Sequence, residues 1–401
     1  MRFFVIGITD NPRPWFPPEV MEVIRSGTLF SGGRRHRGIV AHLLPEGAAW
    51  IDITAPLDEV FEAYRKTASS PIVVFASGDP LFFGFANTIQ RKMPDAELTV
   101  YPAFNSLQML AHRLLLPYHD MRIVSLTGRP WHEFDRAVIE RAGKIGILTD
   151  GEHTPAAIAR RLKDYNYTYY NIFVGERLGN PGQERVSRLS LDEAAVRAFT
   201  MPCCVILTAD GPVAANRFGI PDSEFALLDG REKMITKMPI RLLTLQALEL
   251  SGRRVFWDIG FCTGSVSIEA RLRFPHLQVV AFEKREACRA LIEANSRRHG
   301  APGIHAVVGD FLETDIGGLP RPDAVFIGGH GGRLKEIMEK VLTVLSDDGV
   351  IVMNSVVAPK VPTDSRRLWD DACGQLGLLQ EQPLHIQLND NHPITILKCK
   401  R

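Results

Sequence analysis

The chain has 401 residues, which at about 150 residues per domain corresponds to two or three domains. Hydrophobic residues make up 45% and charged residues 23%, and the formal net charge is +1. These values are typical of a soluble globular protein and argue against a disordered, collagen-like or membrane protein. Basic and acidic residues are also balanced within each half, so no nucleic-acid partner is indicated.

The six cysteines and the start of the chain bear on its compartment. No two cysteines form a C-x-x-C pair, which disfavours zinc ribbons, thioredoxin motifs and iron–sulfur runs. The apolar run at the N-terminus ends at Asp10, Asn11 and Pro12 and is too short for a signal peptide. We therefore expect a reduced, cytoplasmic protein with no metal site and no membrane contact.

In the first half, short runs of β-branched and aromatic residues alternate with amphipathic stretches of helix length. The stretches 105–115 and 154–163 are examples of the latter. The repeated β–α–β order predicts parallel sheets covered by helices. Strands are expected at 2–8, 71–76, 97–101, 122–126, 144–148, 169–174 and 203–208.

Turn-forming residues with few apolar neighbours fill the stretch from 210 to about 232. This change of composition predicts a first domain at 1–210, a linker at 211–231 and a second domain at 232–401. The last two strands of the second domain have no helix between them, which fits one doubly wound α/β domain of seven strands. The strands are expected at 254–259, 277–282, 304–308, 323–327, 349–354, 384–388 and 394–399.

The clearest motif is the loop that follows the strand at 254–259. Gly260 and Gly264 let its backbone approach a ligand, and the helix that begins near Ser265 offers free N–H donors. Glu283 ends the next strand, where a carboxylate can accept both ribose hydroxyls of a nucleoside. The motif therefore predicts a nucleoside site, the alternative being an ordinary strand–turn–helix corner.

The charges around this loop favour S-adenosylmethionine over NAD. A dinucleotide loop follows the pattern G-x-G-x-x-G, whereas here Cys262 and Ser265 replace two of the glycines. Asp258 would repel a pyrophosphate, but it would attract the ammonium group of a methionine tail. Asp310, after the strand at 304–308, is placed to meet the adenine edge.

Two sets of motifs resemble a known family. The loop 258–269, the run Phe-Ile-Gly-Gly-His-Gly-Gly at 326–332 and the segment 234–237 with Arg241 resemble the C-terminal half of precorrin-6Y methyltransferases of the cobalamin pathway. The first half resembles the tetrapyrrole methylase fold of two αβα subdomains. Its motifs are 77–84, 102–106 and 148–150. Together the halves resemble the fused, bifunctional, decarboxylating enzyme, whose second domain is a Rossmann-like methyltransferase.

The resemblance implies S-adenosylmethionine-dependent methylation of carbons 5 and 15 of precorrin-6B or cobalt-precorrin-6B, with decarboxylation of the ring C acetate. It assigns carbon 5 to the first domain, and carbon 15 with the decarboxylation to the second. The donor-binding residues expected in the second domain are Thr236, Asp258, Gly260, Cys262, Thr263, Gly264, Glu283 and Asp310. Those expected in the first domain are Gly78, Asp79, Ser106 and Thr149.

The substrate carries many carboxylates, and arginine suits bidentate carboxylate binding. Lys237 and Arg241 are candidate substrate anchors, and His330 could protonate or orient a carboxylate. Further candidates in the first domain are Arg34, Arg35, Arg37 and Arg129. The alternatives are solvated surface charges, an exposed turn histidine at 330, and plain helix caps at Ser106 and Thr149. We expect a small tetrapyrrole substrate and a homo-oligomer.

Three departures from the family pattern stand in the sequence: Cys262 in place of the usual central glycine, Met238-Pro239-Ile240 before Arg241, and no Gly-Pro-Gly turn after the first strand. Other functions also stay open. The chain could methylate another anionic tetrapyrrole or a small metabolite, or it could bind tetrapyrrole or nucleoside without catalysis. A nucleic-acid methyltransferase is disfavoured, because Phe-Ile-Gly-Gly stands at 326–329 in place of an Asn/Asp-Pro-Pro-aromatic motif.

Overall fold

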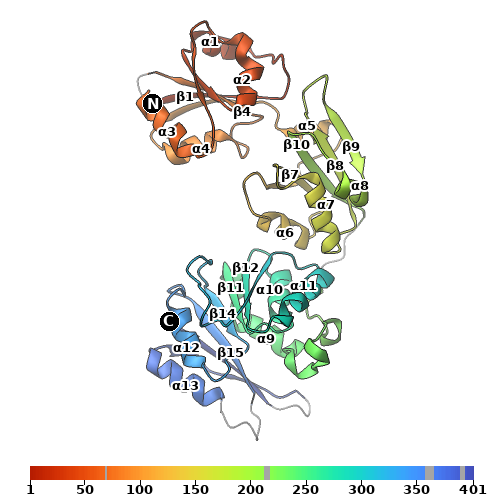
Figure 1. Cartoon of the computed structure of the whole chain (residues 1–401), viewed down its shortest axis with the longest axis vertical. Helices are drawn as coiled ribbons and strands as arrows, with labels where there is room; N and C mark the ends of the chain where they lie inside the picture. The colour runs from red at the N-terminus through yellow and green to blue at the C-terminus, as the bar shows by residue number, and fades with distance from the viewer. Residues whose placement is uncertain (68–69, 212–216, 357–364, 389–392) are drawn as a thin grey trace. The chain divides into compact units, whose positions relative to one another are not determined.

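A computed structural model describes residues 1–67, 70–211, 217–356, 365–388 and 393–401 and shows a mixed α/β chain (Figure 1). The chain divides into two compact units. Unit 1 comprises Met1–Pro130, Ala142–Arg161 and Tyr169–Pro212, and unit 2 comprises Trp131–Arg141, Leu162–Thr168 and Val213–Arg401. Each unit is described by itself.

The first sheet of unit 1 is parallel throughout and has the order β3-β2-β4-β1-β5. Side chains of β1 alternate between two hydrophobic clusters, with Phe3 and Val5 in one and Ile6 and Ile8 in the other. This alternation is the period of two that a strand buried on both faces requires. The strands are β1 (Arg2–Ile8), β2 (Leu29–Gly32), β3 (Ala49–Asp52), β4 (Ile72–Ser77) and β5 (Glu97–Tyr101), and the helices are α1 (Pro18–Ser26), α2 (Arg34–Val40), α3 (Leu57–Lys66) and α4 (Phe85–Lys92).

The second sheet of unit 1 has the order β6-β7-β10-β8-β9. Only β6 and β7 run parallel, since β10 is antiparallel to both β7 and β8, and β9 is antiparallel to β8. The expectation of parallel sheets is therefore wrong for this sheet. The strands are β6 (Arg122–Ser125), β7 (Lys144–Leu148), β8 (Tyr170–Glu176), β9 (Arg185–Leu189) and β10 (Cys203–Ala209), and the helices of this stretch of sequence are α5 (Ser106–Arg113), α6 (His132–Ile139), α7 (Pro155–Asp164) and α8 (Leu191–Val196).

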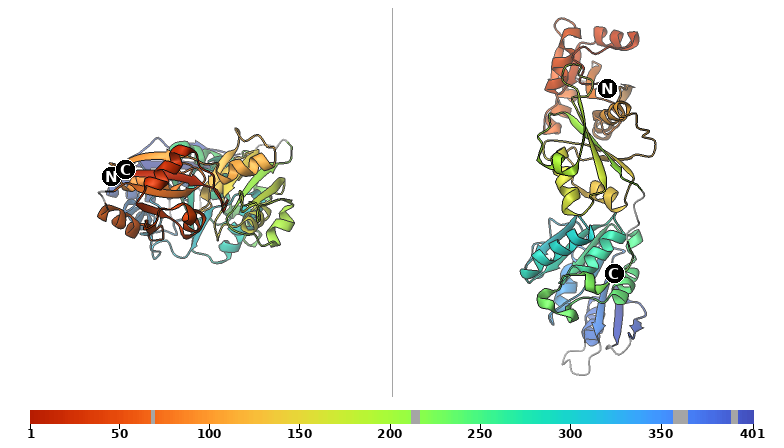
Figure 2. Two further views of the ribbon diagram at one scale, coloured as in Figure 1. Left: turned by 90° about the horizontal axis from the view of Figure 1, so that it is seen from above. Right: turned by 90° about the vertical axis from the view of Figure 1, so that its right-hand side faces the viewer.

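The sheet of unit 2 has the order β13-β12-β11-β14-β15-β18-β16, with β17 also paired to β18. Figure 2 shows the same ribbon from two further sides, with unit 2 mostly in green to blue. The strands β11 to β15 are parallel and β18 is antiparallel. A strand is present at each of the seven expected positions, the sixth as the short β17, whereas β16 was not predicted. The strands are β11 (Val255–Ile259), β12 (Gln278–Glu283), β13 (Ile304–Val308), β14 (Ala324–Ile327), β15 (Val350–Val356), β16 (Leu379–Gln380), β17 (Leu384–Ile386) and β18 (Ile394–Lys400).

Helices cover both faces of this sheet. Buried side chains of α12 and α13 pack on one face, and those of α9, α10 and α11 pack on the other. The helices are α9 (Met238–Ala247), α10 (Ser265–Arg273), α11 (Ala287–His299), α12 (Leu334–Leu342) and α13 (Ser365–Leu376). This arrangement leaves the carboxyl ends of the parallel strands open to a ligand.

The strands that the sequence did not predict are short. β2 has four residues, and β3 and β9 are edge strands whose side chains are half-buried or exposed. An edge strand buries too few side chains to show the apolar run or clean alternation by which strands are recognised.

The predicted linker differs from what the structure shows. Ile220 and Phe225 are buried in unit 2, and the carboxylate of Glu269 on α10 accepts the backbone N–H groups of Gly219 and Ile220 at 2.8 and 3.0 Å. Asn295 on α11 bonds both backbone groups of Ala226. The stretch 219–226 is therefore fastened to unit 2 and is not a solvated linker, while 212–216 lie outside the described residues.

Candidate functional site

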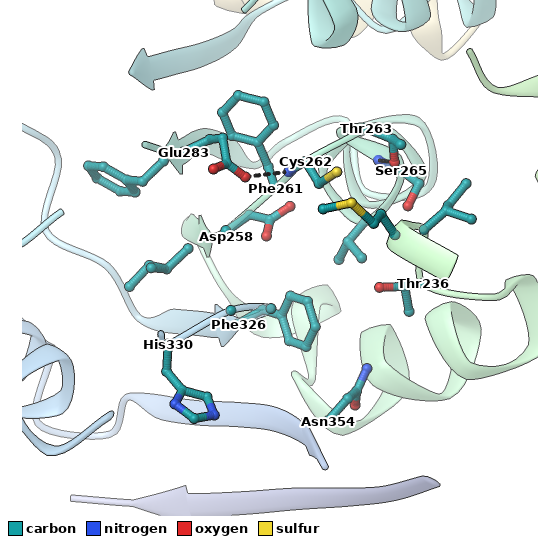
Figure 3. Close-up of a pocket in the computed structure, with 18 of the residues that line it drawn as sticks. Thr236, Asp258, Phe261, Cys262, Thr263, Ser265, Glu283, Phe326, His330 and Asn354 are labelled. Carbon is teal, nitrogen blue, oxygen red and sulfur yellow. Dashed lines mark hydrogen bonds between the residues drawn. The ribbon is translucent and has the colours of Figure 1, made fainter. Parts of the chain in front are cut away.

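A cavity of about 760 Å³ opens at the carboxyl ends of the parallel strands of unit 2 (Figure 3). Loops that follow four neighbouring strands supply much of its wall, and the segment before α9 closes one side. The lining ranges include 233–237, 258–263, 282–285, 309–312 and 328–331. Figure 3 shows Asp258 and Glu283 on one side of the space and His330 and Asn354 on the other.

The glycines of the first loop are required by its backbone. Gly260 has φ +87°, and a Cβ there would lie 2.7 Å from the backbone nitrogen of Gly329. Gly264 has φ +75°, and a Cβ there would lie 2.4 Å from Cγ1 of Ile292. Cys262 also takes a left-handed φ of 46°, a conformation that favours glycine over residues with a side chain.

We expect Gly264→Ala to lower the free energy of unfolding of unit 2 by about 2 kcal/mol or more, because left-handed strain and overpacking add. Gly252→Ala is the matched control, since a Cβ at Gly252 meets nothing within 4 Å. Thermal unfolding of the two variants measures the difference. Equal stability of the two would show that the loop tolerates a side chain at 264.

Asp258 is the carboxylate under the loop. Its side chain is buried, Oδ2 accepts the hydroxyl of Ser267 at 2.6 Å, and Oδ1 is buried without a hydrogen-bond partner among the described residues. Burial raises its pKa to about 7. A buried carboxylate oxygen without a partner is costly, so this atom is suited to a cationic or hydrogen-donating group of a ligand.

Glu283, at the end of β12, accepts four N–H groups. Oε2 accepts the backbone N–H of Cys262 at 3.1 Å and Nη2 of Arg285 at 2.7 Å. Oε1 accepts Nε and the backbone N–H of Arg285 at 2.9 and 3.2 Å. Burial opposes ionisation, but the hydrogen bonds and charge of Arg285 outweigh it, so the pKa of Glu283 is lowered. The carboxylate is therefore charged at neutral pH.

The remaining residues predicted for this site also reach the cavity. Thr236, Gly260, Cys262, Thr263 and Asp310 all line it. Gly264 does not line the cavity but forms the turn into α10 as its N-cap residue. The structure thus brings the predicted residues of the second domain together, and their role in donor binding stays a prediction.

The two predicted substrate anchors of unit 2, Lys237 and Arg241, differ in solvent exposure. Lys237 lines the cavity, is 41% exposed and lies 3.7 Å from Asp222. Arg241 is completely buried, pairs with Glu269 and Asp222 at 3.2 Å each, and donates to the carbonyls of Thr236 and Ile220. No atom of its side chain can reach a substrate, so the prediction of Arg241 as a substrate-binding residue is wrong.

His330 lies half-buried in the glycine-rich loop after β14 and lines the cavity. The backbone N–H of Gly332 donates to its Nδ1 at 3.1 Å, so the proton of the neutral ring is on Nε2, which faces Ser365 at 3.4 Å. Burial lowers its pKa, which keeps the ring neutral at pH 7. His330 is thus placed to donate a hydrogen bond, and a cationic role is disfavoured.

Among the polar residues of the cavity wall that sequence reasoning missed, three stand at or near the ends of strands: Lys284, Arg285 and Asn354. Lys284 and Arg285 directly follow Glu283 at the end of β12, and Asn354 lies near the end of β15. The rule that ligands bind beyond the carboxyl ends of strands in an open α/β sheet would have pointed to all three.

In unit 1, the predicted donor loop follows β4. Gly78 has φ +59°, and a Cβ there would lie 2.8 Å from Cα of Asn105, so the loop after β4 closely approaches the loop after β5. Asp79 accepts the backbone N–H of Leu81 at 2.9 Å, which fixes the turn. The structure therefore requires glycine at 78 for packing, and donor contacts by Gly78 and Asp79 stay a prediction.

The weaker candidates of unit 1 have local roles. Asn105, not Ser106, caps α5, and the hydroxyl of Thr149 donates to the carbonyl of Cys203 at 2.6 Å. Arg34 and Arg37 are exposed. Arg129 bonds Ser125 and the carbonyl of Thr127. Their substrate and donor contacts stay predictions.

The described ranges contain neither a cluster of metal ligands nor a membrane-spanning helix. No group of three or more His, Cys, Asp or Glu side chains there could hold a metal ion. No helix of the described part is long and apolar enough to cross a membrane.

The sheet order and the glycine loop with its two carboxylates define unit 2 as a Rossmann-like domain of the methyltransferase type. Residues 229–375 match the precorrin methyltransferase domain, and residues 7–195 match the tetrapyrrole (corrin/porphyrin) methylases. The precorrin-6Y C(5,15)-methyltransferase (decarboxylating) of Sinorhizobium sp is 32% identical over 380 residues, which are 93% of this chain and 88% of that protein. The chain belongs to the family of decarboxylating precorrin-6Y C(5,15)-methyltransferases.

Two shorter relatives, both from Salmonella typhimurium, each cover part of the chain. The cobalt-precorrin-6B C(15)-methyltransferase (decarboxylating) is 33% identical and covers 43% of this chain and 93% of its own length. The cobalt-precorrin-7 C(5)-methyltransferase is 27% identical and covers 51% of this chain and 97% of its own length. The chain is thus similar both to a fused enzyme and to separate enzymes named for the two methylations.

Proposed function

We propose that the chain is a bifunctional S-adenosylmethionine-dependent C-methyltransferase of corrin biosynthesis. It methylates carbons 5 and 15 of precorrin-6B or cobalt-precorrin-6B and decarboxylates the ring C acetate. The observation that carries this proposal is the presence in one chain of two different methylase segments, 7–195 and 229–375. A relative named for both positions matches 93% of this chain and 88% of its own length.

The proposal assigns carbon 5 to the tetrapyrrole methylase segment and carbon 15 with the decarboxylation to the precorrin methyltransferase segment. It is supported by the names of the two shorter relatives, one for carbon 5 and one for carbon 15 with decarboxylation. The domain limits proposed for these activities are 1–210 and 232–401. The fastening of 219–226 to unit 2 favours an earlier start for the second domain.

The residues of the cavity fit S-adenosylmethionine. The unpartnered Oδ1 of Asp258 suits the ammonium of the methionine tail, Gly260 lines the cavity, and Glu283 suits the ribose hydroxyls. When bound, S-adenosylmethionine supplies a methyl group that its sulfonium has already activated. The task of the protein is then to hold donor and acceptor in line, an effect that can supply several kcal/mol.

Cationic side chains of the same cavity suit the carboxylates of the acceptor. Lys233, Lys237, Lys284 and Arg333 line it together with the neutral His330. Lysine or arginine beside a carboxylate fixes the orientation of the macrocycle. In the decarboxylation, the carbon–carbon bond to the carboxylate breaks, carbon dioxide leaves, and the electron pair passes into the conjugated macrocycle, so no further electron acceptor is required.

We expect donor binding at unit 2 to strengthen as pH rises towards 7. Only the ionised form of Asp258 attracts an ammonium, and burial raises its pKa to about 7, so affinity falls by up to about tenfold per pH unit below that value. Above about pH 8 the α-amino group of the donor loses its own proton, and affinity falls again. Calorimetric titration between pH 5.5 and 8.5 measures the profile. The control is Asp258→Asn, whose affinity should be weak and flat below pH 7; an unchanged slope would place the ammonium elsewhere.

The proposal is tested by incubating the chain with S-adenosylmethionine and either metal-free or cobalt-loaded precorrin-6B. The product masses are then measured by mass spectrometry. The expected product carries two additional methyl groups and lacks one carboxyl group. Binding of both compounds without any change in mass would favour the nonenzymatic alternative. Methylation without loss of carboxylate would contradict the decarboxylating function.

A homo-oligomeric state and a cytoplasmic location complete the proposal. The balanced composition and the reduced cysteines support the second. Light scattering of the purified chain measures the first, and a mass equal to one chain would contradict it.

A further inference from the structure

A cluster of charged side chains in unit 1 surrounds Asp10, which follows β1 and is almost completely buried. Its Oδ1 accepts Nη1 of Arg35 at 2.6 Å, and its Oδ2 accepts Nε of Arg177 at 2.5 Å. The side-chain amide of Asn180 adds a longer bond of 3.4 Å. One buried carboxylate thus holds two guanidinium groups in place.

The cluster has an excess of positive charge. Two arginines face one carboxylate, and the adjacent His36 does not add to or subtract from this charge. Burial and the neighbouring Arg35 lower the pKa of His36 to about 4, so its ring is neutral at pH 7. Since Asp10 is ionised, the group carries one net positive charge, which is available to an anion.

Arg177 offers this charge in a form that suits a carboxylate. It bonds Asp10 through Nε, and its two terminal nitrogens donate to none of the described residues, while its side chain is 25% exposed. Arg35 differs, because its terminal nitrogens are used on Asp10 and on the hydroxyl of Ser77 at 2.7 Å. Two free, parallel N–H donors on a guanidinium held by its third nitrogen form the fork that binds a carboxylate bidentately.

The surroundings match a flat, apolar ring with acidic side chains. Ser77, which bonds Arg35, begins the predicted donor loop. Two aromatic side chains, Phe83 and Phe104, are 45% and 58% exposed and follow the carboxyl ends of β4 and β5. Asp10 follows the carboxyl end of β1, which lies between β4 and β5 in the same parallel sheet. Exposed aromatic rings beyond this edge complement a tetrapyrrole, whose ring stacks and whose carboxylates pair with cations.

We propose that Arg177 binds a carboxylate of the tetrapyrrole where unit 1 methylates carbon 5, and that Asp10 is a positioning residue that orients Arg177 through Nε. This inference rests on the proposed function, because it presupposes that unit 1 acts on the same macrocycle. The competing explanation is that the Asp10–Arg177 pair only ties the two sheets of unit 1 together. The two explanations differ in what substitution does to the substrate KM.

The test uses the whole chain with Arg177→Gln, and product masses report carbon-5 and carbon-15 methylation of precorrin-6B. We expect the KM for the tetrapyrrole in carbon-5 methylation to rise about ten- to a hundredfold, the usual value of a charge-assisted hydrogen bond. The KM for S-adenosylmethionine and the kinetics of carbon-15 methylation should not change. Carbon-15 methylation is therefore an internal control on the same chain. The wild-type KM should also rise with salt, and that of the variant much less.

Two further variants separate binding from folding. Arg113→Gln breaks another arginine–carboxylate pair of unit 1, with Glu184, and should leave every KM unchanged. Asp10→Asn keeps the shape of the positioning residue but not its charge, and should raise the same KM as Arg177→Gln by a smaller factor. Arg177→Lys keeps the ion pair with Asp10 but loses the fork, so it should also raise that KM.

A KM for carbon-5 methylation equal to that of the wild type in both Arg177→Gln and Arg177→Lys would overturn the inference. If Arg177→Gln does not fold, Arg177→Lys alone decides, because it retains the tie between the sheets. Absence of carbon-5 methylation in the wild type would instead overturn the proposed function of unit 1. The two failures are thus distinguished by the wild-type reaction.

Discussion

A chain that carries both Asp258→Asn and Glu283→Gln should yield a product that is one methyl group short and that keeps its acetate carboxylate. The two substitutions remove the charges expected to hold the ammonium and the ribose of the donor in unit 2. Each should cost about 1–3 kcal/mol of donor binding, so together they reduce affinity by at least about thirtyfold. Product mass at limiting S-adenosylmethionine measures the result, because carbon-5 methylation by unit 1 continues.

The complementary lesion is Gly78→Val in unit 1. A side chain at Gly78 would collide with the backbone of Asn105, so the predicted donor loop could not keep its position. Its product should be decarboxylated and one methyl group short. If either lesion abolishes both methylations even when the intermediate for the other unit is supplied, the two units are not independent catalysts, and the two-site proposal is wrong.

Arg241→Met should lower the free energy of unfolding of unit 2 by about 3–5 kcal/mol, because it leaves a buried carboxylate without its cation. Arg241 is completely buried, and it pairs with Glu269, which is also buried. The loss is large compared with the total stability of a domain, about 5–15 kcal/mol. Denaturant unfolding followed by tryptophan fluorescence, to which the buried Trp257 contributes, measures it.

Lys237→Met is the matched control for this prediction. Lys237 is a cation of the same segment, but it is 41% exposed and its distance to Asp222 is 3.7 Å, so its removal should cost less than about 1 kcal/mol. The opposite pattern, with Arg241→Met as stable as the wild type and deficient in substrate binding, would return Arg241 to the role of a substrate anchor.

Much of the fold could be predicted from the sequence, because buried strands have a recognisable local sequence pattern. Parallel strands covered on both faces appear as short apolar runs, and each of the seven runs of the second half corresponds to strands of one sheet. The direction of a strand in its sheet is not encoded in such a pattern. The runs at 144–148 and 203–208 resemble one another, yet the second forms β10, which is antiparallel to β7.

Residues of the candidate site in unit 2 could be predicted where they stand at the end of a strand. Asp258 and Glu283 could be found because each stands at the end of its strand beside a glycine loop. The burial of Arg241 could not, since its partners Glu269 and Asp222 lie 28 and 19 residues away and meet it only in the folded chain. The same is true of Arg177 and Asp10, which are separated by 167 residues.

The four N–H groups that Glu283 already accepts affect how tightly it could bind the ribose of S-adenosylmethionine. A carboxylate has about four lone-pair positions, and Cys262 and Arg285 occupy four. If Glu283 holds the ribose as proposed, the ribose hydroxyls can bind it only in exchange for hydrogen-bond donors that are already present. The measured affinity is then the difference between two sets of hydrogen bonds, and a guanidinium released from Glu283 becomes available to an anion in the same cavity. The proposed ribose contact therefore requires Arg285 or the backbone N–H of Cys262 to give up a hydrogen bond to Glu283.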